Sequence, residues 1–233
     1  MKRILTAVLA LVLLLGAAFA EGTGRLDGIV IGIDPGHQLH GNNEKEPVAP
    51  GSSEKKAKVS SGTAGVSTRI PEYQVNLDVA LQLRDALEAE GATVVMTRET
   101  NEVDISNVER AVMFNEAGVD LGLRIHCNGA DDHSVTGVGL FVRKTGAGAE
   151  ESYDACQFLM PAMTGATGAR VYGIFQRDTY TGLNWCEGPC VLVEMGFMSN
   201  PEEDKKLCDP AYQALLVEGM TEGVCAYFAG WRE

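Results

Sequence analysis

The stretch "SNVERAVMFNEAGVDLGLRIH", residues Ser106 to His126, holds one helix pattern followed at once by one strand pattern. Ser106 and Glu109 stand at the spacing of a capping box, which marks the start of a helix, and Gly118 is typical of a helix end. The apolar residues of "DLGLRIH" then predict a short buried strand that ends at His126. A helix joined directly to a buried strand indicates an α/β fold.

The same alternation continues on both sides of this stretch. Patterns of buried strands occur at residues 28–34, 92–98, 137–144 and 190–196, and helix patterns occur at residues 71–91 and 150–164. Asn200-Pro201 and Asp209-Pro210 each combine an N-cap residue with a proline and predict two more helix starts. We therefore expect a single α/β domain with a mainly parallel sheet and helices on both faces.

Residues 39–70 interrupt this alternation with Gly, Ser, Lys and Glu and with no apolar period. They predict a long loop, whose middle has almost no apolar residue to anchor it. Loops of this length in compact domains are usually functional or mobile, which favours a lid or a wall that faces substrate. A neutral insertion is the alternative, since added loop length costs only about 0.6 kcal/mol per doubling.

The first twenty residues, "MKRILTAVLALVLLLGAAFA", have the pattern of a secretory signal peptide. Two basic residues precede an apolar run that ends in Ala-Phe-Ala, a typical cleavage site. An uncleaved membrane anchor is the alternative, although the apolar run is short for a span. We expect export, and no membrane association once residues 1–20 are removed.

Composition fits one globular domain and excludes some classes of partner. The chain has 233 residues, of which 45% are apolar, and a formal net charge of -13. A nucleic-acid binder would need a basic face, and so would a protein that binds anionic lipid. Neither class fits this charge.

Six cysteines follow the signal peptide, at positions 127, 156, 186, 190, 208 and 225. Six cysteines allow 15 disulfide pairings, and the sequence cannot choose among them. The domain is large enough to fold without disulfides, so we expect mostly free thiols. Cys186 and Cys190 could form a zinc or redox pair, but a single pair is a weak signal.

Four residues that could bind a metal ion or transfer a proton are expected at one edge of the sheet. His37 follows the first strand, His126 ends a central strand, Glu194 ends the last strand, and Glu72 starts the helix after the long loop. Ligands of such sheets bind beyond the carboxyl ends of the strands. Two histidines and one glutamate suit catalytic zinc, and a further carboxylate could take a proton from water.

Each of these residues also has an ordinary structural role open to it. A histidine at a strand end is often only hydrogen-bonded, and Glu72 in a first helical turn could simply face the helix dipole. Glu194 is harder to explain, because a carboxylate after Val-Leu-Val needs a partner or a use. We expect His40 and His133, which lie in polar stretches, to be exposed.

Four motifs, in order, resemble the zinc-dependent N-acetylmuramoyl-L-alanine amidases of the type 3 catalytic-domain family, which hydrolyse bacterial peptidoglycan. They are "IDPGHQ", "PEYQVNLDVALQLRDALEAEGATVVMTRE", "NVERAVMFNEAGVDLGLRIHCNG" and "PCVLVEMGFMSNPEED". The resemblance implies a catalytic domain over residues 28–230. It implies zinc ligands at His37, Glu72 and His126, a catalytic base at Glu194, and Asn128 close behind the ligands. The chain departs from the family pattern at Arg124, where Ser is common, and at Cys127, where Ala is common.

The resemblance further implies that the enzyme cuts the amide bond between N-acetylmuramic acid and the L-alanine of the stem peptide, in the cell envelope or outside it. Two other functions remain open at this point: a zinc peptidase that cuts within the stem peptide, and a silent wall-binding module. A protein activator is a further expectation that the sequence leaves unidentified.

Overall fold

The computed structural model describes residues 24–230, and the predicted signal peptide lies outside them. The elements, in chain order, are β1 (Val30–Pro35), β2 (Asn42–Pro47), β3 (Lys55–Val59), α1 (Glu72–Ala89), β4 (Thr93–Met96), α2 (Asn107–Ala117), β5 (Leu121–Asn128), β6 (Val138–Val142), α3 (Ala149–Thr167), β7 (Val171–Gln176), α4 (Thr181–Asn184), β8 (Cys190–Phe197), α5 (Pro201–Leu207) and α6 (Pro210–Ala229). Among the described residues, no helix is long and apolar enough to cross a bilayer.

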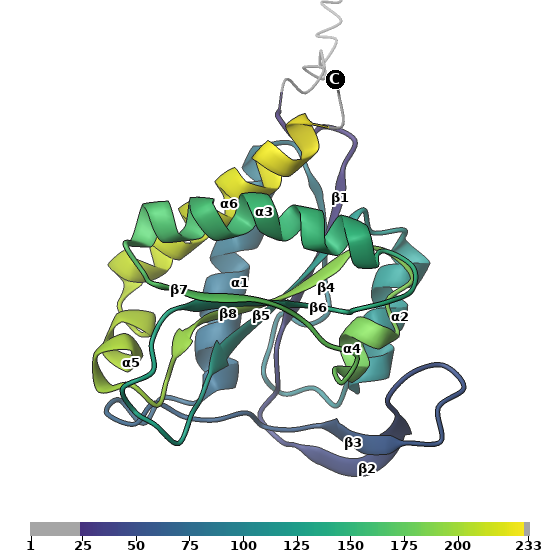
Figure 1. Ribbon diagram of the computed structural model, residues 1–233, viewed down its shortest axis with the longest axis horizontal. Coiled ribbons are helices and arrows are strands. Elements are labelled where there is room, and N and C mark those ends of the chain that lie inside the picture. Colours follow the sequence, from purple (N-terminus) through teal and green to yellow (C-terminus); the bar gives the residue numbers. More distant parts are fainter. Residues whose placement is uncertain (1–23, 231–233) are drawn as a thin grey trace, which may run out of the picture.

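The main sheet has six strands in the order β4-β1-β5-β8-β6-β7. All neighbouring pairs are parallel except β6 and β8, which are antiparallel. Helices cover both faces, with α1, α3 and α6 on one face and α2 and α4 on the other (Figure 1). The predicted α/β domain with a mainly parallel sheet is thus confirmed.

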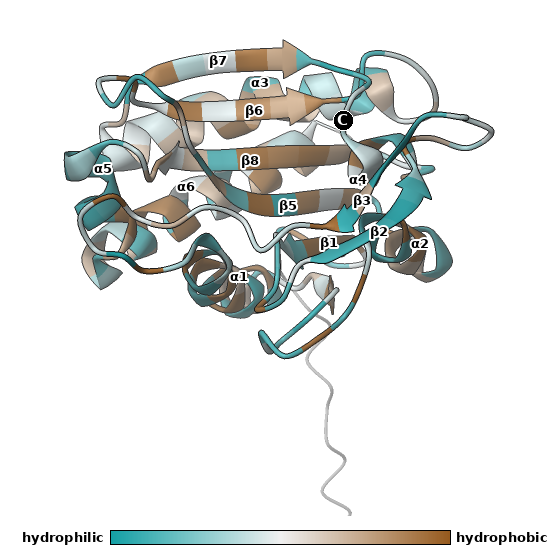
Figure 2. Ribbon diagram, turned by 90° about the horizontal axis from the view of Figure 1, so that it is seen from below, coloured by the Kyte–Doolittle hydropathy of each residue, from teal (hydrophilic) through white to brown (hydrophobic). Residues whose placement is uncertain are grey.

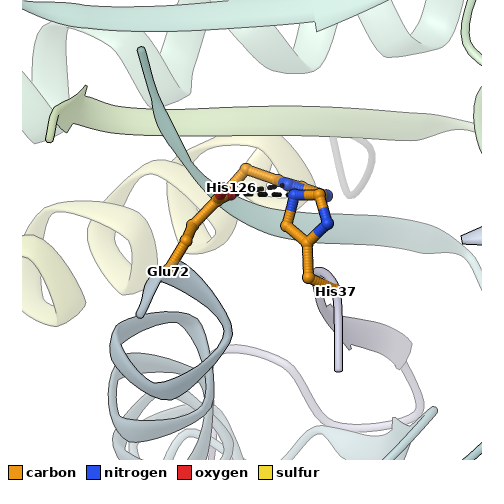
Figure 3. Close-up of side chains that lie close together, drawn as sticks. All are labelled: His37, Glu72 and His126. Atoms are coloured by element: carbon orange, nitrogen blue, oxygen red, sulfur yellow. Dashed lines mark hydrogen bonds and ion pairs between the residues drawn. The ribbon is translucent and has the colours of Figure 1, made fainter. Parts of the chain in front are cut away.

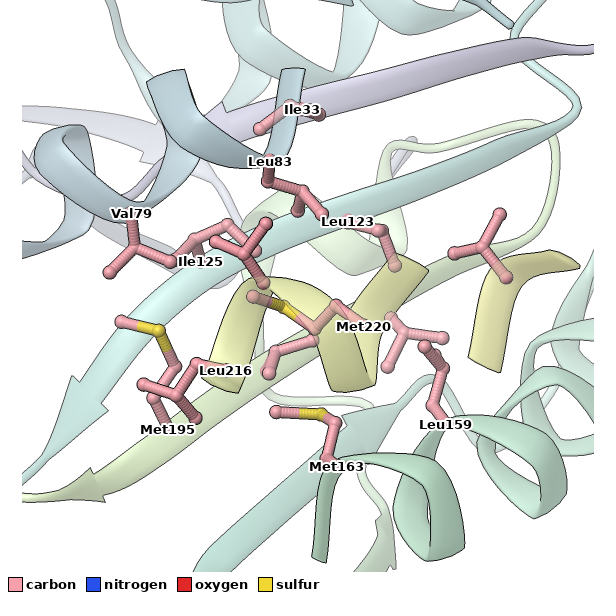
Figure 4. Packing of buried hydrophobic residues seen from close by; sticks show 14 of the residues in the cluster. Ile33, Val79, Leu83, Leu123, Ile125, Leu159, Met163, Met195, Leu216 and Met220 are labelled. Carbon is pink, nitrogen blue, oxygen red and sulfur yellow. The ribbon is translucent and has the colours of Figure 1, made fainter. Parts of the chain in front are cut away.

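The larger hydrophobic core lies between the sheet and helices α1, α3 and α6 (Figure 4). In β5, Leu123 and Ile125 pack into this core, whereas Arg124 and His126 alternate with them and point to the opposite face. Since the strand period is two, the same rule applies to β8, where Val193 is in the core. Every second side chain of β5 and of β8 therefore points to the face of the sheet that α2 covers.

The start signals predicted for three helices are confirmed. The Ser106 side chain accepts from the backbone N–H of Glu109, and the Glu109 side chain accepts from the N–H of Ser106, which completes the capping box. Gly118 ends α2 with φ of 63°. Asn200 and Asp209 accept backbone N–H groups at the starts of α5 and α6. These caps satisfy donors that a helix cannot satisfy by itself.

The prediction of an unanchored loop at residues 39–70 is wrong. Strands β2 and β3 pair as an antiparallel hairpin, a second and separate sheet. The hairpin is not recognisable in the sequence, because Lys and Glu occupy most of its strand positions and the apolar alternation of a half-buried strand is missing (Figure 2). Val48 and Val59 of the hairpin segment are buried, and Glu46 accepts from the N–H of Val108, which ties the hairpin to α2.

The far end of the same segment is also fixed. Asp204 of α5 is fully buried and accepts the backbone N–H groups of Ser67 and Thr68 at 2.6 and 2.8 Å, as well as the hydroxyl of Thr68. The segment between β1 and α1 is therefore held at both of its ends and in its middle.

All six cysteines are free thiols, and five of them are buried. This agrees with the expectation of mostly free thiols. Besides β2 and β3, two further elements were not predicted from the sequence: β7, a partly exposed edge strand, and α4, a helix of only four residues.

Candidate metal centre

The structure brings His37, Glu72 and His126 together, although they come from a turn, a helix start and a strand (Figure 3). Nε2 of His37 and Nδ1 of His126 each lie 3.1 Å from Oε1 of Glu72. The three ligand atoms lie within 4.8 Å of one another. The group could hold a metal ion.

The donor set itself fits a cation. Nδ1 of His37 lies 2.9 Å from the carbonyl oxygen of Ser60, and a carbonyl can only accept, so this nitrogen carries the proton. In a neutral imidazole Nε2 then holds a lone pair, and that lone pair faces the carboxylate of Glu72. Two acceptors at 3.1 Å repel each other unless a positive charge lies with them. Two imidazoles and one carboxylate are ligands that zinc commonly takes.

The pKa shifts of Glu72 and His126 also favour the protonation states that bind a metal ion. Burial alone would raise the pKa of Glu72, but its close interactions with His126 and His37 outweigh burial and hold that pKa below its usual value. Burial lowers the pKa of His126, against the opposing effect of Glu72. A charged carboxylate and a neutral imidazole are the forms in which these side chains bind metals.

The carboxylate of Glu72 is fixed by the backbone around it. Its Oε2 accepts the N–H of Thr63 at 2.9 Å, and its Oε1 accepts the N–H of Cys127 at 3.2 Å. Asn76, one turn along α1, donates to Oε1 at 3.3 Å and also to the carbonyl of Gly36 at 3.2 Å. The orientation of this ligand therefore does not depend on a bound ion.

The turn that carries His37 is held by two buried arginines. His37 has φ of 63°, a left-handed conformation that is rare for a residue other than glycine. Arg98 donates to the carbonyls of Pro35 and Gly36, and Arg110 donates to the carbonyls of Pro35 and His37. Neither arginine is predictable from the sequence as a part of the site, because an isolated arginine has no local pattern that separates it from a surface residue.

Two glycines leave room for the histidines and the carboxylate. A Cβ atom at Gly36 would lie 2.2 Å from Cε1 of His126. A Cβ atom at Gly62 would lie 2.6 Å from Oε2 of Glu72 and 2.8 Å from Cδ2 of His37. Real side chains do not approach so closely, so only glycine fits at either position.

Glu194 lies on the strand next to His126. The two residues are register partners in the parallel pair of β5 and β8. Its Oε2 is buried and has no hydrogen-bond partner among the described residues. Burial, and then the charge of Glu72, raise the pKa of Glu194 well above its usual value. A carboxylate in this environment favours taking up a proton.

All four residues line one cleft of about 1100 Å³. The hairpin contributes Lys56 to its wall, and Tyr180 to Gly182 contribute another part of the wall. Nζ of Lys56 donates to the carbonyl of Thr179 at 2.7 Å, which joins the hairpin to the segment before α4. The volume of this cleft exceeds that of a single amino acid several times over.

The remaining histidines and Asn128 lie outside the group. His40 and His133 are exposed, as expected, and only His133 lines the cleft. Asn128 also lines the cleft, and its side-chain oxygen accepts the N–H of Gly129 at 2.8 Å. Within residues 24–230, no hydrogen bond is seen between the Asn128 side chain and the three candidate ligands.

Comparison with protein families gives a match over residues 31–226 to the family described as N-acetylmuramoyl-L-alanine amidase. The chain is 28% identical over 201 residues to N-acetylmuramoyl-L-alanine amidase LytC of Bacillus subtilis. That alignment covers 86% of this chain and 36% of LytC, so the chain spans little more than a third of that relative.

Two solved structures have the same fold. The N-acetylmuramyl-L-alanine amidase Ami1 from Mycobacterium smegmatis is 26% identical, with a TM-score of 0.78 over 88% of this chain and 99% of that one. The CwlD amidase from Clostridioides difficile, solved in complex with the GerS lipoprotein, is 21% identical. Its TM-score is 0.70, over 87% of this chain and 99% of that one, and it shows the fold alone.

Proposed function

The chain belongs to the N-acetylmuramoyl-L-alanine amidase family, and we propose that it is a zinc-dependent hydrolase of the bond between N-acetylmuramic acid and the L-alanine of the stem peptide in peptidoglycan. One observation carries this proposal: His37, Glu72, His126 and Glu194 line a single cleft, and Oε2 of Glu194 has no hydrogen-bond partner among the described residues.

The proposed ligands are His37 through Nε2, His126 through Nδ1, and Glu72. Zinc, when bound, supplies a Lewis acid that polarises the amide carbonyl and lowers the pKa of water. The protein keeps these side chains in place without the ion, through Ser60 behind His37 and through Asn76 and Thr63 behind Glu72. Such supporting contacts set the tautomer and the orientation of metal ligands.

Glu194 is the proposed general base. Its carboxylate accepts the proton of the attacking water and then donates it to the amine of the leaving L-alanine. The raised pKa of Glu194 and the lack of a hydrogen-bond partner for its Oε2 within residues 24–230 support this role. Its position on the strand next to His126 keeps it beside the reacting amide.

The place of action proposed is the cell envelope or the outside of the cell. The signal-peptide pattern at residues 1–20 supports export, and the names of relatives such as LytC support action on the wall. The proposed catalytic domain runs over residues 28–230, which includes the 31–226 family match. A protein partner is a further proposal, supported by the CwlD amidase in its complex with a lipoprotein.

Digestion of purified peptidoglycan tests the proposal. We expect soluble stem peptides with a new free amino group on L-alanine, identified by amine labelling and mass spectrometry, and no product after chelation. A new amino group at any other residue would assign the site to a peptidase that cuts within the stem peptide. Bound wall with no cleavage at all would assign it to a binding module.

A further inference from the structure

Part of the sheet on the cleft side has no helix over it. Figure 2 looks onto this face, and within residues 24–230 no helix lies in front of β6 and β7. Four aromatic side chains gather here, which we call the aromatic patch: Phe141, Tyr172, Phe175 and Tyr180. Tyr172 is the most exposed of them, at 42%.

The four rings form one connected surface. Phe141 and Phe175 stack with centroids 4.8 Å apart and planes 23° from parallel. Tyr180 meets Phe141 at 5.5 Å, and Tyr172 meets Phe175 at 5.2 Å. These distances are those of favourable ring pairs, so the patch keeps its shape without a ligand.

Two glycines let the rings lie against the strands. A Cβ atom at Gly139 of β6 would be 3.1 Å from the ring of Tyr172, and one at Gly173 of β7 would be 2.8 Å from the ring of Phe175. A side chain at Gly173 would force the Phe175 ring to move, and one at Gly139 would push the Tyr172 ring away by a few tenths of an ångström. The rings therefore pack down on the backbone of β6 and β7 in place of standing away from it.

The aromatic patch begins next to the proposed base. Gly139 is the register partner of Glu194 in the antiparallel pair of β6 and β8, and a Cβ atom there would be 3.7 Å from Cβ of Glu194. Tyr180 belongs both to the patch and to the cleft wall. A ligand that leaves the cleft on this side passes directly onto the rings.

We propose that the aromatic patch binds the glycan strand of peptidoglycan, a specific role that rests on the function proposed above. The scissile amide is attached to a sugar of that strand, so a strand with its amide at Glu194 must lie beside the base. A pyranose ring has a face of C–H groups with slight positive charge, which complements the negative face of an aromatic ring. Arg177, whose guanidinium carbon lies 5.6 Å from the centroid of the Phe175 ring, adds one positive charge beside the rings.

Binding without cleavage tests the patch separately from the reaction. The probe is soluble glycan strands from which the stem peptides have been removed, so that no scissile amide is present, titrated into the protein by calorimetry. We expect Tyr172→Ala to raise the Kd at least about fivefold, the scale of one lost ring contact. Tyr172→Phe keeps the ring and should bind within about twofold of the parent.

Tyr153 provides a matched control. It is 39% exposed and lies on α3, which covers the opposite face of the sheet. Tyr153→Ala should leave the Kd unchanged. If Tyr153→Ala and Tyr172→Ala weaken binding equally, or if the parent binds a dextran of the same length as well as the glycan strands, the patch is not a glycan site.

The outcomes for the patch and for the reaction can be told apart. A parent that cleaves peptidoglycan at L-alanine but does not bind peptide-free strands overturns the inference about the patch and leaves the proposed function intact. A parent that binds the strands through Tyr172 but releases no peptide supports the patch and overturns the hydrolase. In the expected case, Tyr172→Ala raises the KM for long strands more than it lowers kcat.

Discussion

Glu194 stands opposite His126 in the register of two adjacent parallel strands, β8 and β5. Because side chains at paired positions point to the same face, the proposed base and one proposed ligand are neighbours by backbone pairing alone. A shift of one residue in this register would turn Glu194 into the core that holds Val193. The sheet, rather than a flexible loop, sets the distance between them.

Glu194→Gln tests the base directly. The amide keeps the size of the side chain and cannot accept the water proton, so we expect turnover on peptidoglycan to fall by about 10²-fold or more. Bound zinc, measured by metal analysis, should stay at the level of the parent, because Glu194 is not a proposed ligand. Parent-like turnover in this variant would refute the role of Glu194.

Metal content tests the ligand group. We expect about one zinc per chain, removed together with activity by a chelator, as the three convergent side chains imply. His126→Ala should lose both, whereas His40→Ala, an exposed histidine three residues after His37, should keep both. Full activity in metal-free protein would contradict the assignment, and so would equal effects of the two variants.

Asp34→Asn tests the buried charge cluster beneath the turn of His37. Asp34 is fully buried and pairs with Arg110 at 2.7 Å and with Arg124 at 3.0 Å. Loss of its charge leaves two guanidinium groups buried without a counter-ion, so we expect the free energy of unfolding to fall by about 3–5 kcal/mol. Denaturant unfolding gives this value, and Asp85→Asn at an exposed ion pair is the control that should leave the midpoint unchanged.

The pKa of Asp34 also affects how the free energy of unfolding depends on pH. Burial alone would raise the pKa of Asp34, but Arg124, Arg110 and the hydroxyl of Thr97 outweigh it and hold the pKa below its usual value. A lowered folded-state pKa stabilises the protein above the unfolded-state value of about 3.9, and this stabilisation is lost as the pH falls towards the folded-state value. Unfolding of the parent should therefore show an acid loss of stability that is reduced in Asp34→Asn. Identical acid profiles of the two proteins would contradict this.

Replacement of residues 42–59 by a short Gly-Ser linker tests the hairpin. The replacement removes the buried side chains of Val48 and Val59, each of which stabilises the fold by about 1.5–3 kcal/mol, so stability should fall. Zinc should remain, since Ser60 behind His37 is kept, and cleavage of peptidoglycan should drop because Lys56 and its cleft wall are lost. Removal of the tip alone, residues 50–53, is the control. Unchanged stability and cleavage after the full replacement would make the hairpin a neutral insertion.

Strong local signals made most of the fold predictable. The capping box at Ser106 and the Asn-Pro and Asp-Pro starts of α5 and α6 specify helix ends within a few residues. The hairpin has no such signal, because its strands are held by Glu46 and by two isolated valines rather than by an apolar stripe. Strand β7 was not predicted for a related reason. Its residues are exposed or only partly buried, so the strand has no continuous run of buried apolar residues.

The candidate site was predictable because the sheet brings strand ends together. His37, His126 and Glu194 follow this rule, and Glu72 joins them because α1 begins at the same edge. Their convergence is confirmed, while their roles in binding and catalysis stay predictions. Arg98 and Arg110 could not be found this way, because they donate hydrogen bonds to main-chain carbonyls, and no sequence pattern predicts such contacts.

The two glycines beside the ligands affect how a mutational scan of this protein would read. Gly36 and Gly62 bring no reactive atom to the cleft, yet a single methyl group at either one would collide with His126 or with Glu72. In a library of all single substitutions scored by wall hydrolysis, both positions would be as intolerant as the histidines themselves. Such a scan would therefore mark these two glycines together with His37, Glu72, His126 and Glu194, although glycine has no side chain that could bind a metal or transfer a proton.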